Sequence, residues 1–463
     1  MKKINALFFS ILIFSIAFFA FITTNVNSQS DKITITENVL YGDRSVAEGL
    51  TVVNKNHYQY QLFWETEYKI SNTPKYKTNY KFTNTEHFED APNFYDGVIL
   101  NSGVYSGFNV KKPASEQDGI SKVMKELYDN TEPGKTSYKT IRLNDYYEYY
   151  PLDLSFALPD VYYIDNYNEK YGDGKPYNTQ FVGKIFRDFF KIPVLETDTI
   201  SLELSKSADG DGYGIGVDDS KSYNFKSVST FSKGRCYFSI SNQKSGEYVD
   251  TSLIPGGYGI YAFYFDGGDN NNKTGIFADS LEMVFPLEKE AVVFGMDFNP
   301  DESKILLYTY ENEASYLTVI DVKTMKTLKK IHLIDEQVTL DIRQYDNFIA
   351  VGTEDGMVII DSKEYDYKLA FVVDGRQTLK DGANILWNSS YMDYKDGKLA
   401  TVGNLFNEET GITECGFFVS VYDKNGLIYY AEYDNHLDID NNREHYRFGC
   451  HPYDLYPNTI KWS

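Results

Sequence analysis

Short apolar runs recur between residues 291 and 434 and group into three copies of one unit. Their length and their alternation of apolar and polar positions are typical of β-strands. The runs are 294–301, 304–307, 317–321 and 327–331 in the first copy, 348–351, 357–361 and 368–372 in the second, and 398–402, 418–423 and 427–430 in the third.

Turn residues separate these runs. Asp355-Gly356, Asp396-Gly397 and Asn425-Gly426 are strong hairpin signals, because glycine accepts a positive φ without strain. Each copy is therefore predicted to form a series of strands joined by tight turns.

An aspartate closes a strand in each copy, at Asp321, Asp361 and Asp423. The first interval is 40 residues and the second is 62, lengthened by polar stretches around 376–382 and 407–414. A four-stranded unit that repeats every ~40–45 residues has the period of a propeller blade.

Two segments carry a family resemblance. Phe298-Asn299-Pro300-Asp301 with Lys304-Ile305-Leu306, and then Val319-Ile320-Asp321-Val322-Lys323-Thr324, resemble the blade signature of WD40-like and YVTN-like β-propellers. The resemblance covers about a third of the chain. It departs from the strict WD40 pattern, because no Trp precedes the recurring aspartates and no Gly-His pair opens a blade. It implies a fold and no particular activity.

The N-terminal half also favours strands, with two interruptions. Ile120, Val123, Met124, Leu127 and Tyr128 share one face of a short helix, and 182–190 forms another helical segment that ends before Pro193. The expected strands are 33–40, 50–53, 58–64, 78–82, 137–143, 200–204, 223–231, 236–240, 259–265 and 280–285.

The fold class that follows is all-β. The preferred architecture is one β-propeller of six to eight irregular four-stranded blades, with irregular blades over 29–290, regular WD40-like blades over 291–434 and a closing segment over 435–463. A propeller must close on itself, and Thr459-Ile460-Lys461-Trp462 is expected to pair near the N-terminal strand. The alternative is a β-sandwich over about 30–195 followed by a smaller propeller.

The first 28 residues have the layout of an export signal. Lys2 and Lys3 precede an uncharged run from Ala6 to Ile22, and Val26-Asn27-Ser28 offers a cleavage site before Gln29. The run has 17 residues, so an uncleaved signal anchor is the alternative to a cleaved signal peptide. Both predict an exported chain, in the periplasm, on the cell surface or outside the cell, with membrane contact only through an uncleaved N-terminus.

The composition and net charge indicate a folded protein and exclude one class of partner. The chain is 42% hydrophobic and 16% aromatic, which indicates a folded protein, and its net charge is -22. An acidic surface repels phosphate backbones, so no nucleic-acid partner is expected.

The three cysteines, Cys236, Cys415 and Cys450, allow at most one disulfide, and whether any two pair is left open. None lies at metal-ligand spacing from another.

Two oxygen-rich segments are interpreted as turns. Around Asp209-Gly210-Asp211-Gly212, the calcium-loop pattern fails because Tyr213 and Ser220 replace ligands, and the dinucleotide pattern fails because Ile215 stands where the third glycine belongs. The stretch Asp266 to Asn272 is composed of ordinary turn residues.

The remaining candidate chemistry is sparse. His436, His445 and His451 lie near Asp438, Asp440, Glu444 and Cys450 without the spacing of a metal site, and His57, His87 and His332 are dispersed. The segment from Tyr146 to Pro151 is rich in tyrosine, which either presents rings to a ligand or fills gaps in an irregular strand.

No GxSxG, HExxH or P-loop motif occurs, so no catalytic, cofactor-binding or metal residue is assigned and no cofactor is expected. The preferred function is an exported propeller-type binding protein for a protein, peptide or glycan. The alternatives are an extracellular propeller hydrolase acting on glycans or phosphoesters, and a membrane-tethered structural protein of the cell surface.

Overall fold

The computed structural model describes the chain in two compact units. Unit 1 comprises Met1–Asn93 and Asp341–Ser463, and unit 2 comprises Phe94–Leu340. The residues described are 2–27, 33–58, 62–71, 73, 75–82, 97–102, 108, 110–113, 115, 119–158, 179–218, 225–242, 250–265, 275–338, 341–354, 356–374, 389–407, 412–437 and 458–463.

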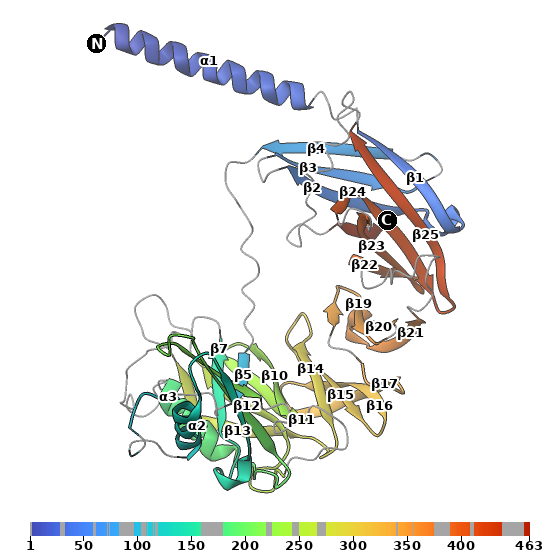
Figure 1. Ribbon diagram of the computed structural model, residues 1–463. Helices are drawn as coiled ribbons and strands as arrows, with labels where there is room; N and C mark the ends of the chain where they lie inside the picture. Colours follow the sequence, from blue (N-terminus) through green and yellow to red (C-terminus); the bar gives the residue numbers. More distant parts are fainter. Residues whose placement is uncertain are drawn as a thin grey trace. The chain divides into compact units, whose positions relative to one another are not determined.

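The described residues form seven antiparallel sheets, which confirms a mostly β chain (Figure 1). The first repeat copy is a four-stranded sheet in unit 2 whose strands lie in sequence order. Its strands are β14 (Val292–Phe298), β15 (Lys304–Glu311), β16 (Ala314–Asp321) and β17 (Lys326–Ile334).

The Asn-Pro-Asp motif after β14 forms the turn into β15. Oδ1 of Asn299 accepts a 2.8 Å hydrogen bond from the backbone N–H of Lys304, and its Nδ2 donates to Asp301 at 2.7 Å. Asn299 is 1% exposed, so its amide supplies hydrogen bonds that water cannot. The motif is therefore a structural turn.

The second and third copies are four-stranded meanders in unit 1. Both begin with a strand that the apolar pattern missed, β18 (Ile342–Gln344) and β22 (Ser389–Lys395), because β18 is short and β22 is mostly polar. The remaining strands are β19 (Phe348–Gly352), β20 (Gly356–Asp361) and β21 (Lys368–Asp374), with the short helix η6 (Lys363–Tyr365), and then β23 (Lys398–Asn407), β24 (Ile412–Asp423) and β25 (Gly426–Leu437).

The recurring aspartate ends the third strand of every meander. Its carboxylate accepts a backbone N–H two or three residues on, from Thr324 to Asp321 at 2.8 Å, Lys363 to Asp361 at 3.0 Å and Asn425 to Asp423 at 2.7 Å. Aspartate recurs there because it closes the turn into the fourth strand.

Both ends of the chain add strands to unit 1. β1 (Ile33–Gly42) pairs with β25, and β26 (Thr459–Trp462) pairs with β2 (Leu50–Tyr58), which confirms the expected C-terminal pairing. The sheet of β26 and β2 continues into β3 (Leu62–Lys69) and β4 (Lys75–Phe82), and η2 (Arg44–Ala47) links β1 to β2.

One strand expectation in this region was wrong. A single strand over 58–64 was expected, but Tyr58 and Leu62 face each other across an antiparallel hairpin. The residues between them include no glycine or proline, so nothing in the local sequence marks the turn.

The first part of unit 2 combines small sheets with helices. Both expected helices are confirmed, as α2 (Gly119–Asn130) and α3 (Thr179–Phe189), and α2 buries Ile120, Val123, Met124 and Leu127. β5 (Gly97–Ser102) pairs with β7 (Leu152–Ala157), β6 (Thr136–Arg142) pairs with β8 (Thr199–Lys206), β8 also pairs with β9 (Tyr213–Asp218), and η5 (Leu143–Asp145) follows β6.

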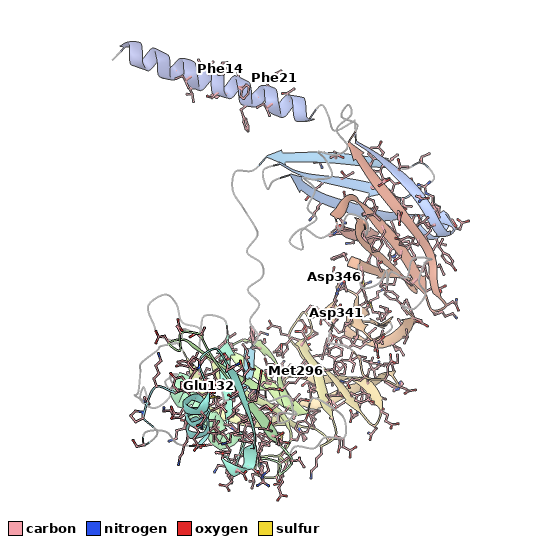
Figure 2. All side chains as sticks on the ribbon, in the orientation of Figure 1. Phe14, Phe21, Glu132, Met296, Asp341 and Asp346 are labelled. Atoms are coloured by element: carbon pink, nitrogen blue, oxygen red, sulfur yellow. The ribbon has the colours of Figure 1, made fainter. Side chains whose placement is uncertain are left out.

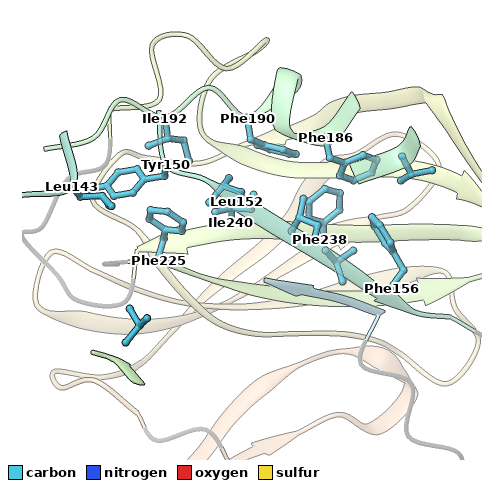
Figure 3. Close-up of a cluster of buried hydrophobic side chains, with 14 of the residues drawn as sticks. Leu143, Tyr150, Leu152, Phe156, Phe186, Phe190, Ile192, Phe225, Phe238 and Ile240 are labelled. Atoms are coloured by element: carbon cyan, nitrogen blue, oxygen red, sulfur yellow. The ribbon is translucent and has the colours of Figure 1, made fainter. Parts of the chain in front are cut away.

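The core of unit 2 is rich in aromatic rings (Figure 3). The ring of Phe186 on α3 lies 5.2 Å from that of Phe156 on β7 and 5.9 Å from that of Phe238 on β11, which fixes the helix on the strands. Sheet β10–β13 supplies the facing residues, with β10 (Phe225–Ser232), β11 (Arg235–Asn242), β12 (Gly259–Phe265) and β13 (Ile276–Pro286).

Edge strands of neighbouring sheets lie against one another inside each unit. In unit 2, β10 contacts both β5 and β14, and in unit 1, β22 contacts β26. A sheet edge that meets another sheet edge is shielded from pairing with other chains.

The N-terminal residues form one long helix, α1 (Lys2–Asn27). Its rings include Phe14 and Phe21, which are 71% and 68% exposed (Figure 2). Within the portion of the chain that the structure describes, no helix meets the length and apolarity needed to cross a membrane.

Candidate binding site on the edge strands of unit 1

The oxygen-rich residues 209–212 lie at the tip of the β8–β9 hairpin, as their interpretation as a turn predicts, whereas Gly214 and Gly216 lie in β9 itself. Asp209 accepts hydrogen bonds from the Ser207 hydroxyl and from the backbone N–H of Asp211, at 3.1 Å for the latter. These hydrogen bonds, led by Ser207, lower the pKa of Asp209. Its carboxylate is used within the turn.

The tyrosine-rich segment follows η5 and belongs to no strand. Tyr150 is 6% exposed and donates a hydrogen bond to Asp198, while Tyr146 and Tyr147 pack against the core of unit 2. These three rings fill the interior, as one of the two interpretations holds, although the segment is not an irregular strand.

Several candidates lie outside the described residues: the oxygen-rich stretch 266–272, His87, His445, His451, Asp438, Asp440, Glu444, Cys450, and the side chains of His57, His436 and Cys415. Of those described, His332 lies 2.7 Å from Asp335, and Cys236 is buried and free. No three His, Cys, Asp or Glu side chains gather as a metal site within the described part of the chain.

Six residues on or beside the edge strands of three unit 1 sheets are linked by contacts between pairs of them. We call them the edge-strand row. Two of them flank β18, one lies within it, two lie in the middle of β22 and one ends β26, and the row comprises Asp341, Arg343, Tyr345, Tyr391, Asp393 and Trp462.

The row begins with a paired charge. Nε and Nη2 of Arg343 donate to the two carboxylate oxygens of Asp341 at 3.2 and 2.9 Å, and both side chains are about one-third exposed. A two-point pair holds the guanidinium plane fixed and still leaves other N–H donors on Arg343. Figure 2 labels Asp341 and Asp346, which flank β18.

The middle of the row is aromatic. The ring of Tyr345 stacks on Phe348 at 4.3 Å and meets the edge of Tyr391, on the neighbouring sheet, at 5.4 Å. Burial raises the pKa of Tyr345 to about 12, so this phenol keeps its proton at neutral pH. Arg343 and Tyr345 interact electrostatically, which joins the aromatic part to the charged part.

The row ends where β26 meets β22. Oδ2 of Asp393 accepts a 2.7 Å hydrogen bond from the backbone N–H of Trp462, and Nζ of Lys395 donates to the carbonyl of Ser463 at 2.9 Å. The indole Nε1 of Trp462 is buried, without a hydrogen-bond partner among the described residues.

The row offers fixed donors, a neutral phenol pair and partly exposed carboxylates. Rings with polar edges and a preoriented guanidinium suit the recognition of a peptide or a sugar. Sequence reasoning missed the row because its members span more than a hundred positions, and only the high tyrosine content hinted at it.

Comparisons with known proteins add little. No family model and no curated protein matches the chain. Among solved structures, Kluyveromyces lactis Hsv2 is similar at 10% identity over 44% of this chain and 60% of Hsv2, with a TM-score of 0.21. An oligogalacturonate lyase in complex with manganese is similar at 9% identity over 52% of this chain and 55% of the lyase, with a TM-score of 0.22.

The chain therefore spans less than two thirds of the length of either similar protein. TM-scores this low carry no argument about fold or activity.

Proposed function

We propose that this chain is an exported propeller-type binding protein that holds a peptide, protein or glycan along the edge-strand row. The observation that carries the proposal is the convergence of the paired Arg343 and the Tyr345–Tyr391 rings from two neighbouring sheets. Ring faces and a fixed guanidinium are the groups that most often dominate binding energy at recognition sites.

The propeller part rests on the sheets. Three consecutive four-stranded meanders share strand order and a turn-closing aspartate. Two of the unit 1 edge strands, β22 and β26, lie side by side, as the innermost strands of adjacent blades do. The row then lies on the innermost strands, where a propeller presents side chains to its channel.

Export rests on Lys2, Lys3 and the uncharged run that follows. Mass analysis of the mature N-terminus tests this part. A start at Gln29 supports a cleaved signal and a released protein. A retained N-terminus supports the alternative, a membrane-tethered surface component.

Hydrolysis is the second candidate function, because Asp341, Asp346 and Asp393 lie on or beside the edge strands. Acid–base catalysis on glycans requires a pair of carboxyl groups with separated roles. Asp341 is held by Arg343 and Asp393 by the Trp462 backbone, so two of the three already have structural partners. This favours binding over hydrolysis.

The test is a binding screen of the exported chain against arrays of peptides and glycans, repeated with Arg343→Ala and Tyr391→Ala. Loss of a charged hydrogen bond costs about 1.5–3 kcal/mol, so Arg343→Ala is expected to weaken binding by ~10–100-fold. Lys326→Ala, an exposed change in unit 2, is the control. Binding that both row variants retain in full, or no binding by the wild type, would overturn the proposal.

A further inference from the structure

Three lysines gather on two tyrosine rings in unit 2. Nζ of Lys206 lies 4.2 Å from the ring centroid of Tyr128, and Nζ of Lys125 lies 5.4 Å from the same centroid. Nζ of Lys111 lies 5.6 Å from the ring centroid of Tyr213. The two rings meet edge to face with their centroids 5.6 Å apart. We call these five residues the lysine–tyrosine cluster.

Helix α2 and the β8–β9 hairpin fix four of the five cluster residues. Lys125 and Tyr128 are three residues apart on α2 and therefore share one face of the helix. Lys206 ends β8 and lies directly opposite Tyr213 in the β8–β9 register. Both rings pack against the core of unit 2, so the aromatic surface is held in place.

The cluster is locally basic in an acidic protein. The chain carries a net charge of -22, yet three ammonium groups converge here. Asp129 pairs with Lys125, whose side chain is only 15% exposed. In the described part of the chain, no carboxylate forms an ion pair with the ammonium group of Lys206, which lies over the Tyr128 ring.

A purely structural role accounts for part of this arrangement. Nζ of Lys206 lies over Tyr128, a residue of the last turn of α2, where positive charge complements the helix dipole. That role does not explain why Lys111 covers the second ring. The carboxylate of Asp209, three residues after Lys206 in the sequence, accepts hydrogen bonds within its own hairpin, from Ser207 and from the backbone of Asp211.

We propose that the lysine–tyrosine cluster binds an anionic group carried on a sugar ring. The ammonium groups of Lys206 and Lys111 would hold the anion, and the tyrosine rings would contact the apolar face of the sugar. The anion is a sulfate ester, a phosphate ester or a carboxylate, which share charge and oxygen acceptors. The net charge of the chain disfavours a long polyanion and favours a single charged sugar.

The test is calorimetric titration of the full exported chain with glucose 6-sulfate, glucose 6-phosphate and glucuronate, which identify the anion. Neutral glucose tests the contribution of the sugar ring alone, and inorganic sulfate tests the contribution of the charge alone. The expected result is binding of at least one charged sugar more tightly than either control ligand. Lys206→Ala and Lys111→Ala are each expected to weaken it by about tenfold, and added salt to weaken it further.

Lys326→Ala is the matched control, because Lys326 is an exposed lysine of the same unit outside the cluster. The Lys326→Ala variant is expected to bind the charged sugar with the same affinity as the wild type. Tyr128→Leu removes a ring without changing charge and is expected to lower affinity for charged sugars but not for inorganic sulfate.

Three outcomes would overturn the proposal: no charged sugar binds, neutral glucose binds as tightly, or Lys206→Ala lowers the melting temperature while binding stays unchanged. The last outcome would leave Lys206 with the helix-end role alone. The edge-strand row lies in the other unit, so row variants test the proposed function separately.

Discussion

The hydroxyl of Tyr433 donates a 3.1 Å hydrogen bond to Oε1 of Glu37, a residue 396 positions earlier in the chain. Tyr429 donates to the same oxygen at 2.9 Å, and Arg44 pairs with the other carboxylate oxygen at 2.9 Å. The Glu37 side chain is 13% exposed. Three partners therefore hold this carboxylate, and the two tyrosines among them attach β1 to β25.

Tyr433→Phe is expected to lower the free energy of unfolding by about 1–2 kcal/mol, because it removes a charge-assisted hydrogen bond inside a packed region. Urea unfolding measures the change. Tyr41→Phe, at a 49% exposed tyrosine on β1, is the control and is expected to stay within about 0.5 kcal/mol of the wild type. Equal effects of the two changes would show that the Glu37 network contributes nothing.

Stability is expected to fall as pH rises from about 10 towards 12. Burial raises the pKa of Tyr68, Tyr345 and Tyr422 to about 12, above the value of ~10 for an unfolded tyrosine. The fold holds these phenols neutral, so their contribution is complete below about pH 10 and is lost above it.

Urea midpoints at about pH 9 and about pH 11 measure this loss. Tyr422→Phe removes one titrating phenol and is expected to make the fall shallower. A midpoint that is the same at both pH values would contradict the prediction.

Local patterns predicted much of the fold. The helix over 119–130 could be predicted because its five apolar residues share one face. The meanders could be predicted because glycine turns separate their strands. The pairing of β1 with β25 was not readable, since residue spacing carries no information about partners 396 positions apart. The edge-strand row was missed for the same reason, because Arg343, Tyr391 and Trp462 lie on the edge strands of three different sheets.

Ile460→Ala is expected to destabilise the chain by about 2–4 kcal/mol, because Ile460 is 1% exposed in the core of unit 1. Chemical unfolding followed by tryptophan fluorescence reports it, since Trp462 lies on the same strand. Lys461→Ala, on the exposed face of β26, is the matched control and should change little. A loss below about 0.5 kcal/mol for Ile460→Ala would mean that β26 is dispensable for stability.

Asp321→Ala is expected to cost about 1–2 kcal/mol, because Asp321 accepts hydrogen bonds from both the backbone N–H and the hydroxyl of Thr324, at 2.8 and 2.7 Å. Asp361→Ala, which removes a single described hydrogen bond at 3.0 Å, is expected to cost less. Glu290→Ala is an exposed control. The reverse order of the two aspartate variants in thermal unfolding would contradict this account of the repeat.

Cys236 is expected to resist alkylation in the folded protein. Burial raises the pKa of its thiol, so little of the reactive thiolate forms, and the side chain is 0% exposed, so the reagent cannot reach the sulfur. Peptide mapping after treatment with iodoacetamide at about pH 8 reads out this site separately from the other cysteines. Modification at the same rate with and without denaturant would show that the site opens readily.

The two units differ in when their strands become available during synthesis, because unit 2 is continuous in sequence and unit 1 is not. Unit 2 is one uninterrupted stretch, so all its strands are available once residue 340 has emerged from a ribosome or an export channel. Unit 1 is made of two separate stretches of the chain. Its strands β1 and β2 are synthesised first, whereas their partners β25 and β26 are synthesised last. The leading strands must therefore stay unaggregated while more than two hundred residues pass, which makes the wait before β25, and any chaperone present during it, a determinant of yield.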